Sequence, residues 1–258
     1  MERMVDYQID KDGVAVVMIN NPPVNALTQK VKETLEIVFD EMASKEEIRV
    51  VILTGGDKVF VAGGDIKGFP DLNPVTARQM VLRTQMMLLK IENFPTPVIA
   101  SVEGRCWGGG CELSMCCDIR VASEGATFGQ PEVNLAIMPG AGGTQRLPRL
   151  VGSGKAKEMI FTARILSSRE AMEIGLVEKI VPNGKALEEA REIAGEILKK
   201  GPVAIKMAKK AINLGISLPL IEGLQAEADC FSYLFGTEDK DEGAKAFFEK
   251  RSPQYKGR

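Results

Sequence analysis

Apolar and polar residues follow one pattern in the first half of the chain and another in the second. Short apolar runs bounded by Gly and Pro predict strands, and apolar residues every three or four positions predict helices. The first half predicts strands at 5–10, 14–20, 50–56, 97–104 and near 118–123, and helices at 29–44, 75–93 and 109–117. Beyond residue 150 only helical patterns follow, at 153–161, 167–174, 185–200, 202–214, 217–235 and 238–249. This order favours an α/β core with a helical C-terminal region.

The length and charge of the chain limit the domain organisation and the partners that can be expected. A chain of 258 residues is long for one ordinary domain and short for two. We therefore expect a core over residues 1–194 and a smaller helical region over 195–258. A net charge of −2 gives no reason to expect nucleic acid or a membrane surface as a partner. The charged N-terminus lacks an apolar signal region, and no run approaches the length of a membrane span.

The residue types available for chemistry are restricted. The chain has no His, which excludes Ser–His–Asp and Cys–His nucleophilic machinery and leaves acid–base work to Glu, Asp, Lys, Tyr or Cys. Its five Cys form no CxxC pair, so we expect small buried apolar residues and no zinc site. Cysteine usage of this kind is typical of a reduced, cytoplasmic protein.

Three glycine-rich segments stand next to predicted helices, at 61–67, 108–113 and 140–147. A loop of this kind can leave backbone N–H groups free to bind an oxyanion or a phosphate, or it can serve only as a tight turn. Nucleotide motifs are absent, because 151–157 lacks the full P-loop pattern and no stretch reads GxGxxG.

Two glutamates stand in unusual positions. Glu112 follows three glycines and opens an apolar helix, and Glu132 follows Pro131 in GQPEVN. A carboxylate in such surroundings is costly unless it is paired, protonated or used. Two carboxylates in a partly apolar cleft can hold a water molecule while one takes a proton and the other gives one. The alternative is that both are ordinary charges at helix N-termini.

The segment 97–150, with GQPE at 129–132 and PGAGGTQRL at 139–147, resembles the enoyl-CoA hydratase/isomerase (crotonase) family. The resemblance extends to 21–27, 60–67, 171–182 and 235–251. It implies an α/β fold built as a spiral of ββα repeats, with C-terminal helices that support a homotrimer or homohexamer. The implied substrate is an acyl-CoA thioester, and no separate cofactor or metal is expected because coenzyme A is part of the substrate.

The resemblance also implies roles for particular residues. The thioester carbonyl would accept hydrogen bonds from the N–H groups of Gly64 and Gly109. Glu112 would activate water for attack on the β-carbon, and Glu132 would deliver a proton to the α-carbon. The CoA portion would lie along Ala62, Gly63, Gly64, Asp65 and Ile66, near Lys58 and Lys67, with Lys250 supplied by a neighbouring subunit. Each of these lysines is also compatible with a solvated surface charge.

Because both glutamates are present, the expected reaction is reversible syn hydration of a 2-enoyl-CoA, with a short straight acyl chain as the default. A cyclic or dienoyl thioester, and a double-bond isomerase that uses Glu132 alone, remain alternatives. Trp107, the only Trp, would either shape the acyl pocket or fill core, and the same holds for Met80, Met86 and Met87. A lysine-rich helix at 204–212 offers a remote RNA-binding alternative, although no aromatic residues accompany it.

Overall fold

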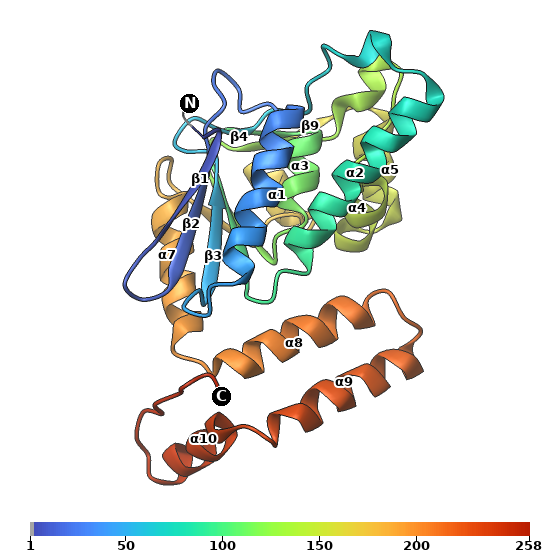
Figure 1. Ribbon diagram of the computed structural model, residues 1–258. Coiled ribbons are helices and arrows are strands. Elements are labelled where there is room, and N and C mark those ends of the chain that lie inside the picture. The colour runs from blue at the N-terminus through green and yellow to red at the C-terminus, as the bar shows by residue number, and fades with distance from the viewer. Residues whose placement is uncertain (1–2) are drawn as a thin grey trace.

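The computed structural model describes residues 3–258 and contains two β-sheets within that range (Figure 1). The larger sheet has six strands in the order β1 (Val5–Ile9), β2 (Val14–Ile19), β3 (Val50–Thr54), β5 (Val98–Val102), β7 (Ile119–Ser123) and β10 (Lys179–Val181). The smaller sheet has four strands in the order β4 (Val59–Val61), β6 (Arg105–Trp107), β8 (Thr127–Gly129) and β9 (Ile165–Ser167). Only β1–β2 and β8–β9 are antiparallel pairs among these strands.

Helices follow the strands and then continue alone to the C-terminal end. They are α1 (Gln29–Ala43), α2 (Pro74–Glu92), α3 (Gly109–Ser114), α4 (Gly143–Val151), α5 (Ser153–Phe161), α6 (Ser168–Glu173), α7 (Ala186–Leu198), α8 (Pro202–Gly215), α9 (Leu220–Leu234) and α10 (Glu238–Phe248). Two short 3₁₀-helices cover Phe69–Asp71 and Pro131–Leu135. No helix within residues 3–258 combines the length and the apolar character needed to cross a membrane.

The strand order reveals a repeated unit. β3, β5 and β7 lie side by side in the larger sheet, and the strand after each of them, β4, β6 and β8, lies in the smaller sheet in the same order. A helical segment follows each pair: α2, then α3, then the 3₁₀-helix Pro131–Leu135 with α4. Each repeat thus adds one strand to the larger sheet and one strand to the smaller sheet, next to the strands of the repeat before it. This is the predicted spiral of ββα repeats, and that prediction is confirmed.

Burial of the larger sheet on both faces explains why its strands are almost wholly apolar. Along β3, Val50 and Ile52 pack with the alanines of α7, whereas Val51 and Leu53 belong to the core on the other face. Successive side chains of a strand point to opposite faces, so both sets must be apolar when helices cover both sides. Figure 1 shows α1 and α7 on these two sides.

Most predicted elements are present, and their ends follow local signals. The Thr28 hydroxyl accepts a hydrogen bond from the Val31 N–H and begins α1, as its sequence position suggests. Asn73 begins α2 through a capping box with Thr76. All five cysteines are buried and unpaired, as predicted for small apolar residues. Burial raises the pKa of the Cys117 thiol to about 12.

The sequence interpretation was wrong or incomplete at five short strands and one helix. The strands β4, β6, β8, β9 and β10 have three residues each, too few to show a period of two. The prediction that only helices follow residue 150 is therefore wrong for β9 and β10. β4 pairs in parallel with β6. The helix α4 escaped notice because it begins at Gly143 and contains Pro148, two residues that disfavour helices.

The C-terminal helices join the core through α8. Lys209 of α8 forms an ion pair of 2.7 Å with Asp118 and also donates to the Thr96 carbonyl. Asn213 of the same helix donates to the Glu92 carbonyl at the end of α2. Only 8% of the Lys209 side chain is exposed, so it does not belong to a solvated lysine face. This finding removes one of the three lysines on which the RNA-binding alternative depended.

The Lys209–Asp118 pair makes a prediction about stability. Lys209→Ala would leave a largely buried carboxylate without its cation, and we expect the free energy of unfolding to fall by about 3 kcal/mol. The matched control is Lys199→Ala, because Lys199 pairs with Glu196 in an exposed i,i+3 arrangement and should change stability by under about 0.5 kcal/mol. Chemical denaturation of both variants measures the difference, and equal effects would contradict this assignment.

Candidate active site

Two of the glycine-rich loops meet at one place. The Leu27 N–H donates to the Gly63 carbonyl at 2.9 Å, which fixes the loop after β4 against the segment 21–27. A methyl group placed on Gly109 would lie 3.5 Å from the Gly64 nitrogen. Gly109 is the first residue of α3, so its N–H has no acceptor within the helix. The structure therefore brings the amides of Gly64 and Gly109 close together.

Close backbone contacts explain the run of three glycines at 108–110. A Cβ atom on Gly110 would lie 2.0 Å from the Val61 carbonyl oxygen, a distance at which the backbone would have to move. Gly108 has a φ of 52°, and its Cβ atom would lie 2.9 Å from a carboxylate oxygen of Glu132. Gly64, in contrast, has open space where its Cβ atom would be. The turn thus needs glycine at 108 and 110 for steric reasons.

Glu112 is a buried carboxylate with its own set of donors. It lies in α3 with 2% exposure, and its Oε1 accepts the Ala141 N–H at 2.7 Å and the Gly143 N–H at 2.8 Å. Burial raises the pKa of Glu112, and the two N–H groups together with Arg146 oppose that shift. The third glycine-rich loop therefore binds an anion, but the anion is the protein's own carboxylate.

Glu132 lies in a different environment. It belongs to the 3₁₀-helix that follows β8, and its side chain is half-buried. Burial, with a contribution from the charge of Glu112, raises the pKa of Glu132 to about 7. With its amide nitrogen turned toward Glu132, the buried Gln130 side chain donates to both carboxylate oxygens at 3.1 and 3.2 Å. At neutral pH this carboxyl group exists in both protonation states.

Together these groups have the chemistry that proton transfer next to a bound anion requires. Glu112 has N–H donors that favour its ionised form, whereas Glu132 is ready to carry a proton. Carboxyl groups whose environments push their pKa values apart are typical acid–base pairs. The amides of Gly64 and Gly109 lie beside them and can receive a developing oxyanion. Residues 3–258 contain no group of three or more potential metal ligands from His, Cys, Asp and Glu.

The predicted CoA-binding residues lie in two places. Ala62–Ile66 form the loop after β4, with Gly64 and Ile66 exposed, and Lys58 and Lys67 project from the surface on either side of it. Lys250 follows α10, which lies at the other end of the molecule from β4 (Figure 1). Within one chain, Lys250 is therefore separate from the rest of the predicted site.

Several supporting residues gave no clear signal in the sequence. Asn25 has a φ of 53°, and its buried amide donates to the carbonyls of Gly55 and Val59, which fixes the turn before β4. Arg146 of α4 donates to the Ala141 carbonyl and pairs with Glu92 at 2.7 Å. An Asn in a Pro-rich loop and an Arg in an unpredicted helix are common features. The sequence pattern therefore marks neither residue as part of a site.

The structure favours packing roles for Trp107 and Met87 but not for Met86. Trp107 Nε1 donates to Thr127 at 3.0 Å, and the exposed Arg105 guanidinium lies 5.0 Å from the ring centre. Both contacts lie on the smaller sheet, on the face opposite the buried Cys106. Met87 is in the core, whereas Met86 is 65% exposed, so these two methionines do not line one common pocket.

Comparison with known proteins decides the family. The sequence model for enoyl-CoA hydratase/isomerase matches residues 10–258. The chain belongs to this family. The family prediction made from the resemblance of segment 97–150 is therefore confirmed.

Two relatives and one solved structure from this family are similar to this chain over almost their whole length. A short-chain-enoyl-CoA hydratase of Clostridium acetobutylicum is 45% identical, with 94% of each chain covered. A crotonyl-CoA hydratase of Syntrophomonas wolfei is 44% identical, with 95% of each chain covered. The crystal structure of an enoyl-CoA hydratase from Bacillus anthracis has a TM-score of 0.94 and 43% identity, covering 99% of this chain and 100% of that one.

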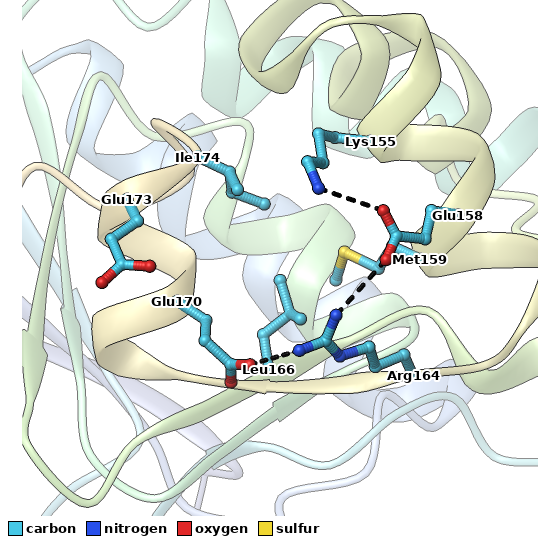
Figure 2. Close-up of a pocket in the computed structure, with 8 residues that line it drawn as sticks. All are labelled: Lys155, Glu158, Met159, Arg164, Leu166, Glu170, Glu173 and Ile174. Carbon is cyan, nitrogen blue, oxygen red and sulfur yellow. Dashed lines mark hydrogen bonds and ion pairs between the residues drawn. The ribbon is translucent and has the colours of Figure 1, made fainter.

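A separate pocket of about 160 Å³ lies between α5, α6 and β9 (Figure 2), and neither Glu112 nor Glu132 lines it. Its charged side chains bind one another. Glu158 pairs with Lys155 at 3.1 Å and with Arg164 at 3.3 Å, and Arg164 also pairs with Glu170. These mutual ion pairs leave little charge to attract an ionic ligand, so the pocket is a poor candidate for the family's site.

The contact between Gly110 and Val61 makes a second prediction. Gly110→Ala would force backbone movement where α3 meets β4, and we expect a loss of at least about 2 kcal/mol in unfolding free energy. Gly154→Ala is the matched control, because that glycine has open space and lies in α5, where alanine should stabilise by about 0.5–1 kcal/mol. Denaturant titrations measure both values, and a neutral Gly110→Ala would contradict the described packing.

Proposed function

We propose that this protein is an enoyl-CoA hydratase that adds water in syn fashion across the 2,3 double bond of a short-chain 2-enoyl-CoA. The observation that carries the proposal is the pair formed by Glu112 and Glu132, in contrasting environments beside two closely spaced glycine amides. Relatives named for short-chain enoyl-CoA and crotonyl-CoA support the acyl length. They do not favour an isomerase or a hydratase of cyclic or dienoyl thioesters.

The first step is polarisation of the thioester. Its carbonyl oxygen accepts hydrogen bonds from the N–H groups of Gly64 and Gly109, so that negative charge can move onto oxygen when the β-carbon is attacked. Donors fixed in the fold need no reorganisation at that moment, and one such donor contributes about 3 kcal/mol to stabilising a transition state. The close contacts of Gly108 and Gly110 hold the α3 terminus in place for this purpose.

The second step is addition of water. Oε1 of Glu112 is held by two backbone N–H groups, which leaves Oε2 to accept a proton from the water molecule. The water oxygen bonds to the β-carbon, and the carboxyl proton of Glu132 passes to the α-carbon. Glu112 ends protonated and Glu132 ionised, so the pair carries one proton throughout. The reverse sequence dehydrates a 3-hydroxyacyl-CoA.

The substrate's CoA portion is assigned to the loop Ala62–Ile66. Exposed Lys58 and Lys67 border this loop and supply positive charge for the CoA phosphates. Lys250, far from this loop in its own chain, is assigned to the CoA bound by a neighbouring subunit. Coenzyme A enters as part of the substrate, and the proposed reaction needs no further cofactor.

An oligomer supports this assignment of Lys250. The C-terminal helices expose large apolar side chains, including Leu220, Ile221, Phe231, Phe235, Phe247 and Phe248. Isolated soluble chains rarely leave so many large apolar side chains exposed in one region of the chain. We assign residues 195–258 to subunit contacts in a homotrimer or homohexamer. A cytoplasmic location is supported by five unpaired cysteines, which suit a reducing compartment.

The proposed function is tested with crotonyl-CoA. The wild type should remove the conjugated enoyl thioester absorbance rapidly, and Glu112→Gln and Glu132→Gln should each slow that loss by at least about 100-fold. Glu173→Gln, an exposed residue of α6, is the matched control and should leave the rate unchanged. A wild type that binds CoA but leaves crotonyl-CoA intact would overturn the short-chain assignment.

The pH dependence provides an independent test. Reaction starts from a glutamate pair that carries one proton, and with a pKa of about 7 for Glu132 that proton is lost at higher pH. We expect kcat/KM for hydration to fall about tenfold per pH unit above pH 7 to 8. Dehydration of 3-hydroxybutyryl-CoA should fall in parallel, because both directions need the same number of protons. Activity that stays constant to about pH 9.5 would rule out this role for Glu132.

A further inference from the structure

One peptide unit connects Glu112 to a side chain outside the proposed machinery. The N–H of Ala141 donates to Glu112 Oε1 at 2.7 Å. The carbonyl of Gly140, on the other side of the same peptide bond, accepts the side-chain amide of Gln85 at 2.8 Å. Because the peptide unit is planar, fixing its carbonyl also fixes the direction of its N–H. A donor at the oxygen also polarises the unit and strengthens the bond that the N–H makes.

The Gln85 side chain extends from α2 to this loop, and the packing around the loop restricts movement of its backbone. A Cβ atom on Gly140 would lie 3.3 Å from Val81, one helical turn before Gln85, so the helix lies directly against the loop. The next carbonyl, that of Ala141, accepts Arg146 at 3.1 Å, and Arg146 is held by Glu92 at the end of α2. The two carbonyls that flank the Ala141 N–H are thus both tied to α2, one directly and one through an ion pair.

We propose that Gln85 is a positioning residue for Glu112, acting through the Gly140–Ala141 peptide to hold the Ala141 N–H on the carboxylate. The proposal rests on the proposed function for its effect on rate, but the contact itself does not depend on the substrate. Gln85 touches neither Glu112 nor the oxyanion position, so its influence passes through the backbone. It follows that the orientation of the Glu112 carboxylate, the proposed general base, depends on the position of α2.

The charged and titratable groups that face Glu112 come from several elements. They are Arg146 of α4, Glu132 of the 3₁₀-helix and the Cys116 thiol just beyond the end of α3. Gln85 is uncharged, so replacing it with another uncharged residue alters none of these charges. Any change in the titration of Glu112 would then report the weakened Ala141 hydrogen bond, because a carboxylate that loses a donor binds its proton more tightly.

The test compares Gln85→Met with Gln79→Met, an exposed position on the same helix. With crotonyl-CoA, Gln85→Met should lower kcat about fivefold to twentyfold, leave KM within about twofold, and move the acidic limb of the kcat profile upward by about half a pH unit or more. Gln79→Met should match the wild type. If Gln85→Met lowers only the melting temperature and leaves kcat and its pH profile intact, Gln85 merely packs α2 and the proposal is wrong.

A second variant covers the case in which Gln85→Met folds poorly. In Gln85→Glu, a protonated carboxyl can still donate to the Gly140 carbonyl, whereas the ionised form repels it. The kcat of this variant relative to wild type should therefore be highest at low pH and fall as the introduced carboxyl group ionises. A ratio that does not change with pH would contradict the proposal.

A spectroscopic measurement separates this proposal from the proposed function. The Glu112 carboxyl can be titrated by infrared difference spectroscopy, with Glu112→Gln used to assign its band. Gln85→Met should raise its pKa whether or not crotonyl-CoA is a substrate. A wild type that is inactive with crotonyl-CoA but shows this shift would overturn the short-chain assignment alone, and an active wild type without the shift would overturn the role of Gln85.

Discussion

The carboxylate of Glu112 is the group around which the other parts of the site are arranged. A charge with 2% exposure is costly to bury, and two backbone N–H groups from a loop some thirty positions later compensate for it. Those donors exist only because the loop turns sharply at Gly140–Gly143 and continues as α4. The loop is held in turn by α2 and by the Arg146–Glu92 pair. Removal of any part would leave a buried anion short of donors.

The spiral of repeats supplies the geometry that this arrangement needs. Each repeat places a strand in the larger sheet, a strand in the smaller sheet and then a loop at the same edge of the molecule. The loop after β4 therefore meets the loop after β6, and the loop after β8 brings Glu132 to the same place. The contact of Gly110 with the Val61 carbonyl shows how tightly neighbouring repeats fit. Residues far apart in the sequence come together because the repeats lie in parallel.

Sequence reasoning found the parts of this site that have strong local signals. Glycine runs, a carboxylate at the start of an apolar helix and the long strands follow from residue type and spacing, which point to Glu112 and Glu132. The expected roles of Gly64 and Gly109 follow from the family resemblance. The three-residue strands are too short to show a period and depend on the strands they pair with, whereas α4 is obscured by its Gly and Pro residues. The partners of Glu112 were not found, because backbone N–H groups have no sequence signature.

In the proposed mechanism, the single proton of the glutamate pair means that the catalyst does not return to its starting state when product leaves. Hydration ends with the proton on Glu112, which is the state from which dehydration begins, so a proton must move back to Glu132 before the next addition of water. An enzyme of this kind has two resting isomers that differ only in where one hydrogen lies. Each turnover of the proposed cycle therefore includes an internal return of one proton as well as bond making at carbon.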